Sequence, residues 1–127
     1  MTYNILVVDD SKLARMAVAK ALNSLQPEWN RVEATNADEA LELVREGSID
    51  LALMDFNMPG RDGLRLAAEL RQLDADMPLA LISANQQQEI VKRAGEVGAT
   101  FLAKPLTEHA LREFIDDAVL RLKARSR

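Results

Sequence analysis

Three short, uninterrupted apolar runs constrain the fold of this chain more than any other feature. They cover Ile5–Val8, Leu51–Met54 and Leu79–Ile82. A strand with one face in solvent alternates apolar and polar residues, whereas a strand buried on both faces is apolar throughout. The three runs therefore predict central strands of a parallel sheet that is covered on both sides.

Two further stretches have weaker strand character. Arg31–Thr35 alternates through Val32 and Ala34, and Thr100–Ala103 is short and follows the turn residue Gly98. Both fit strands that are less buried than the three continuous runs. The chain is thus expected to contain five strands.

Apolar residues at helical spacing lie between these strands and after the last one. The five stripes contain Ala14, Val18, Ala21, Leu22 and Leu25; Ala37, Ala40, Leu41 and Val44; Ala67 and Leu70; Ile90, Ala94 and Val97; and Leu111, Phe114, Ile115, Ala118, Val119 and Leu122. Asn36 and Thr107 are candidate N-caps for the second and fifth helices, and Gln26 followed by Pro27 ends the first. Five strands alternating with five helices predict a doubly wound α/β fold with right-handed crossovers and helices on both faces.

The length of 127 residues predicts one domain, residues 1–127, with a core over about 4–122. The basic helix end and tail at 121–127, with Arg121, Lys123, Arg125 and Arg127, is interpreted as a favourable helix C-terminus. A contact with a partner or with nucleic acid is the alternative interpretation of this tail.

Composition excludes several classes of protein. The chain has no cysteine, which excludes disulfides and thiolate metal sites. No apolar run approaches the roughly 18 residues of a membrane span, and Asp9 and Asp10 interrupt the apolar segment after Met1 too early for a signal peptide. A net charge of −4 argues against nucleic acid as an electrostatic partner. We therefore expect a cytoplasmic protein without a membrane partner.

Polar side chains follow four of the predicted strands at the point where each strand ends. Asp9 and Asp10 follow the first run, Asp55 the second and Ser83 the third, and Lys104 comes directly after Ala103. Ligands of open α/β sheets bind beyond the carboxyl ends of the strands. The sequence therefore predicts a binding site at this edge that contains these five residues.

The chemistry of the set suits a cation and a phosphoryl group. Two carboxylates about 4 Å apart repel each other by roughly 1 to 4 kcal/mol. A cluster of oxygen ligands prefers a hard cation, Mg²⁺ or Mn²⁺. The Ser83 hydroxyl and the Lys104 ammonium can both contact anionic oxygens, and an aspartate such as Asp55 can act as a nucleophile towards phosphorus.

Several motifs in this order carry a resemblance to a known family. They are the pair Asp9 and Asp10, the segment Asp55–Gly63, the pair Ser83 and Ala84, and the segment Phe101–Pro105. The chain resembles, over about 4–122, the receiver domain of two-component response regulators, and in length the stand-alone chemotaxis (CheY-like) type. The resemblance implies a flavodoxin-like sheet with strand order 2-1-3-4-5.

The resemblance also implies roles for the residues at this edge. Asp55 would accept a phosphoryl group from the phosphohistidine of a sensor histidine kinase or a histidine phosphotransfer protein. Mg²⁺ would be held by Asp10, the Asp55 side chain and the backbone carbonyl of Asn57, with Asp9 acting largely through water. Ser83 and Lys104 would contact the phosphoryl oxygens.

Further positions match the switch and turn residues of the family. Phe101 would be the switch aromatic, and the Lys104–Pro105 bond would be cis. The turn residues after the acceptor would be Pro59, Gly60, Asp62 and Gly63, of which Asp62 is expected to cap the third helix or stabilise the turn. The signal would leave through the face made by the fourth helix, fifth strand and fifth helix, to an unknown protein, from a monomer or a weak dimer formed on phosphorylation.

Other interpretations of the acidic edge remain open. Asp9 or Asp10 alone could cap the first helix. A metal-dependent phosphohydrolase could use Asp55 as nucleophile, although it would need a general acid and a substrate cap, and neither is visible in the sequence. A binding module could keep the fold without being phosphorylated, although Asp55, Lys104 and the acidic pair are all present. In the receiver interpretation the chain is not an enzyme beyond its own phosphoryl transfer and slow autodephosphorylation.

Overall fold

A computed structural model describes residues 2–58, 60–85 and 87–125. The elements in chain order are β1 (Asn4–Val8), α1 (Lys12–Leu25), β2 (Asn30–Ala34), α2 (Ala37–Arg45), β3 (Leu51–Asp55), α3 (Gly63–Leu73), β4 (Leu79–Ser83), α4 (Gln88–Glu96), β5 (Ala99–Ala103) and α5 (Glu108–Arg125). The predicted turn residue Pro59 and the end of the basic tail, Ser126 and Arg127, lie outside the described residues. Across the described ranges, the structure has no helix with the length and apolar character that a membrane crossing requires.

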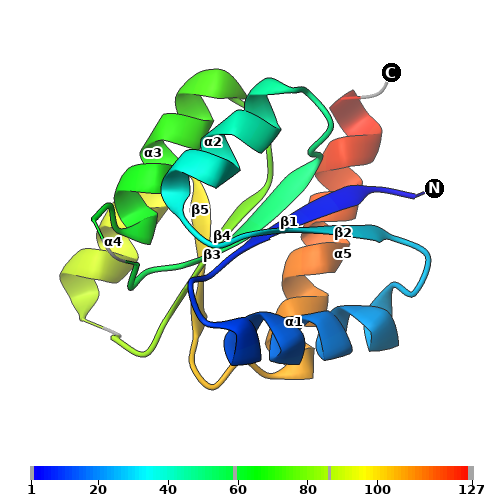
Figure 1. The fold of residues 1–127 in the computed structure, drawn as a ribbon, viewed down its shortest axis with the longest axis horizontal. Helices are drawn as coiled ribbons and strands as arrows, with labels where there is room; N and C mark the ends of the chain where they lie inside the picture. Colours follow the sequence, from blue (N-terminus) through cyan, green and yellow to red (C-terminus); the bar gives the residue numbers. More distant parts are fainter. Residues whose placement is uncertain (1, 59, 86, 126–127) are drawn as a thin grey trace.

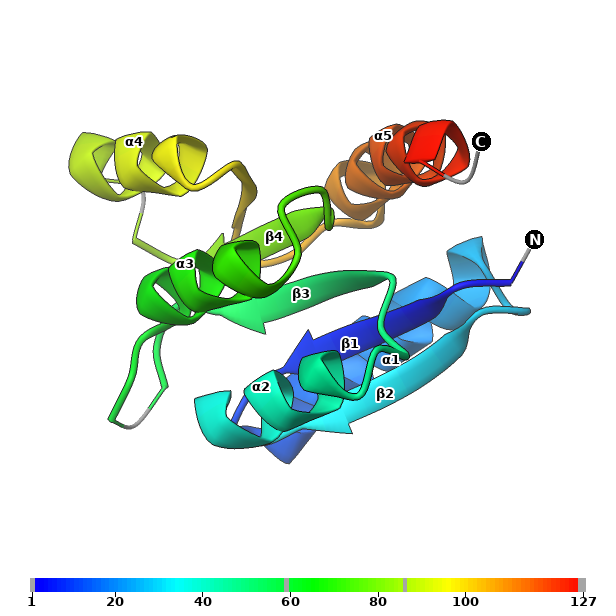
Figure 2. The ribbon, with the colours of Figure 1, turned by 90° about the horizontal axis from the view of Figure 1, so that it is seen from above.

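The sheet has the predicted architecture. Its strand order is β2-β1-β3-β4-β5, and every neighbouring pair is parallel. Figures 1 and 2 show α2, α3 and α4 on one side of the sheet and α1 and α5 on the other. The doubly wound α/β fold and the flavodoxin-like strand order are confirmed.

Each face of the sheet has its own apolar core, which explains the continuous apolar runs. Leu6 and Val8 of β1 pack with α2, α3 and α4, while Ile5 and Val7 pack with α1 and α5. Strands β3 and β4 divide their residues between the two cores in the same way. Because side chains alternate along a strand, a strand between two cores must be apolar at every position.

The edge strands β2 and β5 are more exposed, and their predicted bounds were one residue off. β2 begins at Asn30, whose amide donates to the Tyr3 carbonyl at 3.0 Å. It ends at Ala34, because the next amide, that of Thr35, donates to the Glu39 carboxylate at 2.8 Å and leaves the ladder. β5 likewise begins at Ala99 and not at Thr100.

Side-chain caps begin four of the helices. The amides of Ala14, Glu39, Arg65 and Ala110 donate to the side chains of Ser11, Asn36, Asp62 and Thr107 at 3.2, 2.8, 2.8 and 3.1 Å. The predicted caps Asn36, Asp62 and Thr107 are therefore confirmed. Ser11 caps α1, so the acidic pair before it is not needed for this purpose. Within the described residues, Gln87 at the start of α4 makes no side-chain cap.

Candidate functional site

Three carboxylates meet at the edge where the strands end. Asp9 directly follows β1, Asp10 comes next, and Asp55 is the last residue of β3. One oxygen from each lies within 4.8 Å of the others. Asp9 and Asp55 are buried, and Asp10 is exposed. The predicted acidic cluster is therefore formed, with two of its charges withdrawn from water.

Asp55 is buried, and its Oδ1 contacts the Lys104 ammonium group. The residue is 4% exposed. The Lys104 ammonium nitrogen lies 2.6 Å from Asp55 Oδ1, and no other residue that the structure describes donates a hydrogen bond to this oxygen. One ammonium group does not neutralise the three clustered carboxylates, so a bound cation would stabilise the site.

Asp9 is the second buried carboxylate at this edge, and its surroundings raise its pKa. Burial raises the pKa of Asp9 above its ordinary value, and the negative charges of Asp55 and Asp10 raise it further. A hydrogen bond from the Ser11 amide, 2.9 Å from Asp9 Oδ1, and the charge of Lys104 act in the opposite direction without cancelling the shift. The folded chain thus disfavours the ionised form of Asp9, and a bound cation would relieve this. Carboxylate oxygens fit a hard divalent cation such as Mg²⁺.

The other predicted polar residues lie at the same edge. Ser83, the last residue of β4, is fully buried, and its hydroxyl accepts a hydrogen bond from the Asn85 amide at 3.0 Å. β4 pairs with β3 on one side and β5 on the other, and the Lys104 amide donates to the Ser83 carbonyl at 3.0 Å. The Lys104–Pro105 bond is cis, as the resemblance implied. Asn57 is exposed in the loop after β3, two residues beyond Asp55.

The turn residues and the aromatic residue are placed as follows. Gly60 has a φ of +82°, in the left-handed region that favours glycine. Gly63 begins α3 against the end of β3, where a Cβ atom would lie 2.2 Å from the Asp55 carbonyl oxygen. Phe101 on β5 is half-buried and lies in a hollow of about 260 Å³ with Phe114 of α5.

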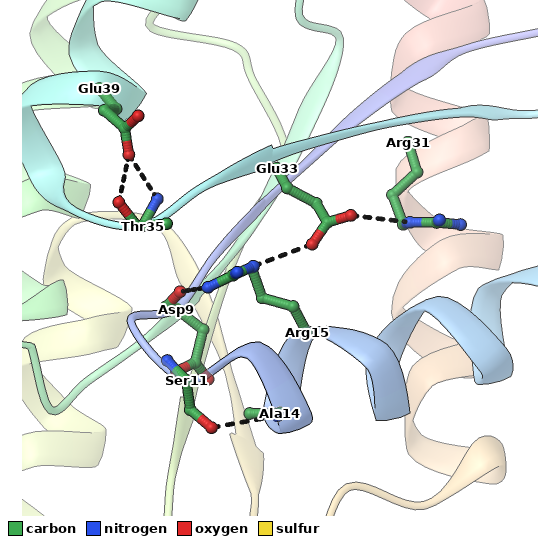
Figure 3. Close-up of polar contacts among 8 residues, drawn as sticks. All are labelled: Asp9, Ser11, Ala14, Arg15, Arg31, Glu33, Thr35 and Glu39. Carbon is green, nitrogen blue, oxygen red and sulfur yellow. Dashed lines mark hydrogen bonds and ion pairs between the residues drawn. The ribbon is translucent and has the colours of Figure 1, made fainter.

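The sequence predicted no structural role for two arginines at this edge. Arg15 of α1 donates to the Asp9 carbonyl and to the Glu33 carboxylate, as Figure 3 shows. Arg61 in the β3–α3 loop pairs with Asp38 of α2 at 3.1 Å and with Glu69 of α3 at 2.6 Å. A basic residue near the N-terminus of a helix, where the dipole disfavours it, was the available signal for Arg15.

An apolar groove lies beside the acidic edge. It has a volume of about 600 Å³ and is lined by Asp9, Ala14, Ala17, Val18, Ala21, Ile82, Ala84, Lys104, Pro105 and Leu106. Leu13 and Met16 of α1 are 79% and 56% exposed. One face of α1 therefore presents two large apolar side chains to solvent. Such patches mark interaction sites when they are contiguous.

The fold and this edge define a class of protein. Residues 5–116 match the family model of the response regulator receiver domain. The chain is 35% identical to the chemotaxis protein CheY of Bacillus subtilis over 119 residues, which cover 91% of this chain and 97% of that protein. It is 31% identical to CheY of Halobacterium salinarum over 121 residues, covering 94% and 98%. The chain therefore belongs to the receiver domain family of two-component signalling and is a CheY-like member of it.

Other relatives are much longer than the match. The chain covers 30% of the cyclic di-GMP phosphodiesterase response regulator RpfG of Xanthomonas campestris, with 36% identity. It covers 11% of the sensor histidine kinase RcsC of Salmonella typhi, with 37% identity. Among solved structures, a response regulator receiver domain from Clostridium thermocellum superposes with a TM-score of 0.87, at 25% identity and over 96% of this chain and 98% of that one. These matches agree on the receiver fold.

Proposed function

We propose that this chain is a phosphorylation-dependent signalling switch in which Asp55 accepts a phosphoryl group. The observation that carries the proposal is the state of Asp55. Its carboxylate is buried at the end of the central strand, paired with Lys104 and clustered with two more carboxylates. A nucleophile in this position can react with phosphorus while neighbouring charges neutralise the product.

Mg²⁺ fits the donor set at this edge. Asp10, the Asp55 side chain and the backbone carbonyl of Asn57 would hold the ion directly, and Asp9 would act largely through water. When bound, Mg²⁺ supplies positive charge for the phosphoryl oxygens and reduces the repulsion within the acidic cluster. Mn²⁺, which also prefers oxygen ligands, could replace it.

The chain's own residues position the phosphoryl transfer. An Asp55 carboxylate oxygen forms the new O–P bond as the N–P bond of the donor phosphohistidine breaks, and the bonding electrons leave with the imidazole. The Lys104 ammonium and the Ser83 hydroxyl contact the phosphoryl oxygens. Lys104 already lies against Asp55, so little rearrangement is needed to place its charge.

The donor is proposed to be a histidine kinase or a histidine phosphotransfer protein that docks on α1. Leu13 and Met16 of α1 are exposed, and other residues of α1 line the apolar groove together with Asp9 and Lys104. A partner seated there would bring its phosphohistidine to Asp55. One structural neighbour supports this class of donor: the receiver domain of yeast Ssk1, solved with the histidine phosphotransfer protein Ypd1, superposes at a TM-score of 0.76 and 23% identity over 87% of this chain and 83% of that one.

The signal is proposed to leave through α4, β5 and α5. Phosphorylation adds about −1.5 to −2 charges at Asp55. The Ser83 hydroxyl would turn from the Asn85 amide to the phosphoryl group, and Phe101 would move into the space that it leaves. The start of α4, where Gln87 provides no side-chain cap, can follow this movement. The downstream target would be a protein that binds this face, either on a monomer or on a weak dimer.

Intact mass measurement tests the proposal. The chain is incubated with Mg²⁺ and acetyl phosphate or phosphoramidate, alongside Asp55→Asn. We expect the wild type, and not the variant, to gain one phosphoryl mass. Sustained turnover of a small phosphoester would instead favour a phosphohydrolase. The absence of any adduct with every donor would favour a binding module.

A further inference from the structure

We propose that Arg15 is a positioning residue for the metal site. Its guanidinium holds the backbone of Asp9, and hence the β1–α1 loop that carries Asp9 and Asp10, in the conformation that binds the cation. The inference rests on the proposed function, because the cation is the Mg²⁺ of the phosphoryl site. It adds a residue from α1 that does not touch the cation itself.

The contacts of Arg15 are short and partly buried. Arg15 Nη1 donates to the Asp9 carbonyl oxygen at 2.6 Å, and Nε donates to Glu33 Oε1 at 2.8 Å. The Arg15 side chain is 13% exposed. Figure 3 shows the guanidinium between Asp9 at the end of β1 and Glu33 on β2. Arg15 therefore connects the acidic loop to the neighbouring strand.

Asp9 is held at three points, and only one of them depends on a distant side chain. Its amide donates to the Ala34 carbonyl at 3.1 Å and continues the pairing of β1 with β2. Its carboxylate accepts from the Ser11 amide at 2.9 Å. Its carbonyl accepts from Arg15. Removing the guanidinium would leave this carbonyl free to rotate, and the carboxylates on either side of that peptide bond would lose their fixed orientation.

Glu33 makes this arrangement compatible with cation binding. A bare guanidinium near the acidic cluster would compete with Mg²⁺ for the same negative charge. The Glu33 carboxylate lies 2.8 Å from Arg15 and 3.7 Å from Arg31, so it offsets this positive charge locally. The guanidinium can thus act through its hydrogen bond more than through its charge.

The two possible roles of Arg15, orienting the loop and supplying positive charge, predict opposite effects of Arg15→Gln on Mg²⁺ affinity. If Arg15 acted only as a positive charge, Arg15→Gln would bind Mg²⁺ more tightly, because the cluster would become more negative. If it orients the loop, Arg15→Gln would bind Mg²⁺ more weakly, by about tenfold as is typical when a residue that orients a metal ligand is lost. The proposal commits to the second result.

The test is calorimetric titration with Mg²⁺, at a temperature where circular dichroism shows each variant to be folded. We expect Arg15→Gln to raise the dissociation constant about tenfold and Arg15→Lys, which keeps the charge but replaces the two-nitrogen contact, to raise it by a smaller factor. The matched control is Arg31→Gln, because Arg31 contacts the same Glu33 carboxylate and, among the described contacts, none on Asp9. This control should bind Mg²⁺ as the wild type does.

A second measurement needs no metal. In Mg²⁺-free buffer, amide hydrogen exchange at Asp10 and Ser11 should be faster in Arg15→Gln than in the wild type or in Arg31→Gln. Unchanged or tighter Mg²⁺ binding by Arg15→Gln would overturn the inference. If that variant does not fold, an Arg15→Lys affinity equal to that of the wild type would overturn it instead. Failure of the wild type itself to bind Mg²⁺ would contradict the proposed function and not the role of Arg15 alone.

Discussion

Buried or half-buried charged side chains lie both at the edge of the sheet where the strands end and at the opposite edge where they begin, but their partners differ. Where the strands end, Asp9 and Asp55 are buried beside the third carboxylate, that of Asp10, and Lys104 pairs with Asp55. Where β4 and β5 begin, the charged group is Arg71 of α3. Its guanidinium donates to five backbone carbonyls, those of Val97, Asp74, Ala75, Met77 and Gly98, at 3.0, 3.3, 2.9, 2.8 and 3.0 Å.

This difference indicates that one edge of the sheet contributes mainly to stability and the other mainly to function. Burial and the nearby Arg121 charge lower the pKa of Arg71, but its five acceptors come from the chain itself and compensate the lost hydration. The acidic edge is completed only by ligands from outside. The edge where the strands begin therefore holds the fold together, and the acidic edge keeps charge available for a cation and a phosphoryl group.

The largest effect on stability is expected from substitution of Gly63, where α3 packs against the end of β3. A Cβ atom there would lie 2.2 Å from the Asp55 carbonyl oxygen and 2.8 Å from Leu81 Cδ1, so α3 would have to move away from β3. We expect Gly63→Ala to lower the free energy of unfolding by about 4 kcal/mol, measured by urea denaturation. The site would be displaced with it.

Gly95 in α4 provides the control for Gly63. Apart from the chain neighbours and the backbone of α4 itself, no described atom lies within 4 Å of a Cβ built at this position. Gly95→Ala should therefore raise the free energy of unfolding by roughly 0.5 kcal/mol through the better helix propensity of alanine. A similar loss in both variants would show that the close approach at Asp55 is not the cause.

The next largest effect is expected at the edge where β4 and β5 begin, where Arg71 finds its acceptors within the chain itself. Arg71→Ala would leave several carbonyls without donors and should lower the free energy of unfolding by about 3 kcal/mol. Once folded, the variant should still be phosphorylated, because Arg71 lies at the opposite edge from Asp55. The control is Arg112→Ala on α5, where one exposed ion pair with Glu108 is lost and the expected change is within about 0.5 kcal/mol. A large loss of phosphorylation in folded Arg71→Ala would contradict the separation of the two edges.

A smaller effect is expected from the pH dependence of Asp9. Because its folded pKa is raised, Asp9 favours the folded state below its unfolded pKa, and this contribution is lost as the pH rises through the folded pKa. In metal-free buffer, Asp9→Asn should therefore gain stability relative to the wild type as the pH rises across that interval. Urea denaturation at a series of pH values measures this. Loss of stability by Asp9→Asn relative to the wild type as the pH rises would contradict the direction of the shift.

Magnesium should restore part of the wild-type stability at neutral pH. A ligand present at ten times its dissociation constant stabilises the folded state by ~1.4 kcal/mol. The same denaturation series with and without Mg²⁺ checks this. Equal midpoints in both buffers would mean that the acidic cluster does not bind the ion.

The features that the sequence predicted well are those that repeat along it. Ile5–Val8 indicated a central strand because both of its faces are buried, and Asn36 indicated a helix start because its cap is made within three residues. The contacts of Arg71 and Arg15 were not predicted, because most of their acceptors are backbone carbonyls, and some lie far along the chain, 26 residues away for Val97 and 18 for Glu33. Every residue has a backbone carbonyl, so a contact with one cannot be recognised from the types of residue in the sequence.

Gly63 shows an intermediate case. The sequence placed it in the turn after Asp55, but the reason for a glycine is the contact with the Asp55 carbonyl and not the turn itself. Its φ is not among the positive values, which occur at Gly47, Gly60 and Gly98. A close approach between α3 and β3 depends on packing in three dimensions, and only the structure shows it.

The most direct test of the account is to locate the phosphoryl group. After incubation with Mg²⁺ and acetyl phosphate, borohydride reduction converts an aspartyl phosphate to homoserine, and tryptic peptides are then fragmented in the mass spectrometer. The peptide that ends at Arg61 contains both Asp50 and Asp55, and the peptide that ends at Lys12 contains Asp9 and Asp10. We expect homoserine at Asp55 alone. Homoserine at Asp9, Asp10 or Asp50, or at none of the aspartates, would contradict the account.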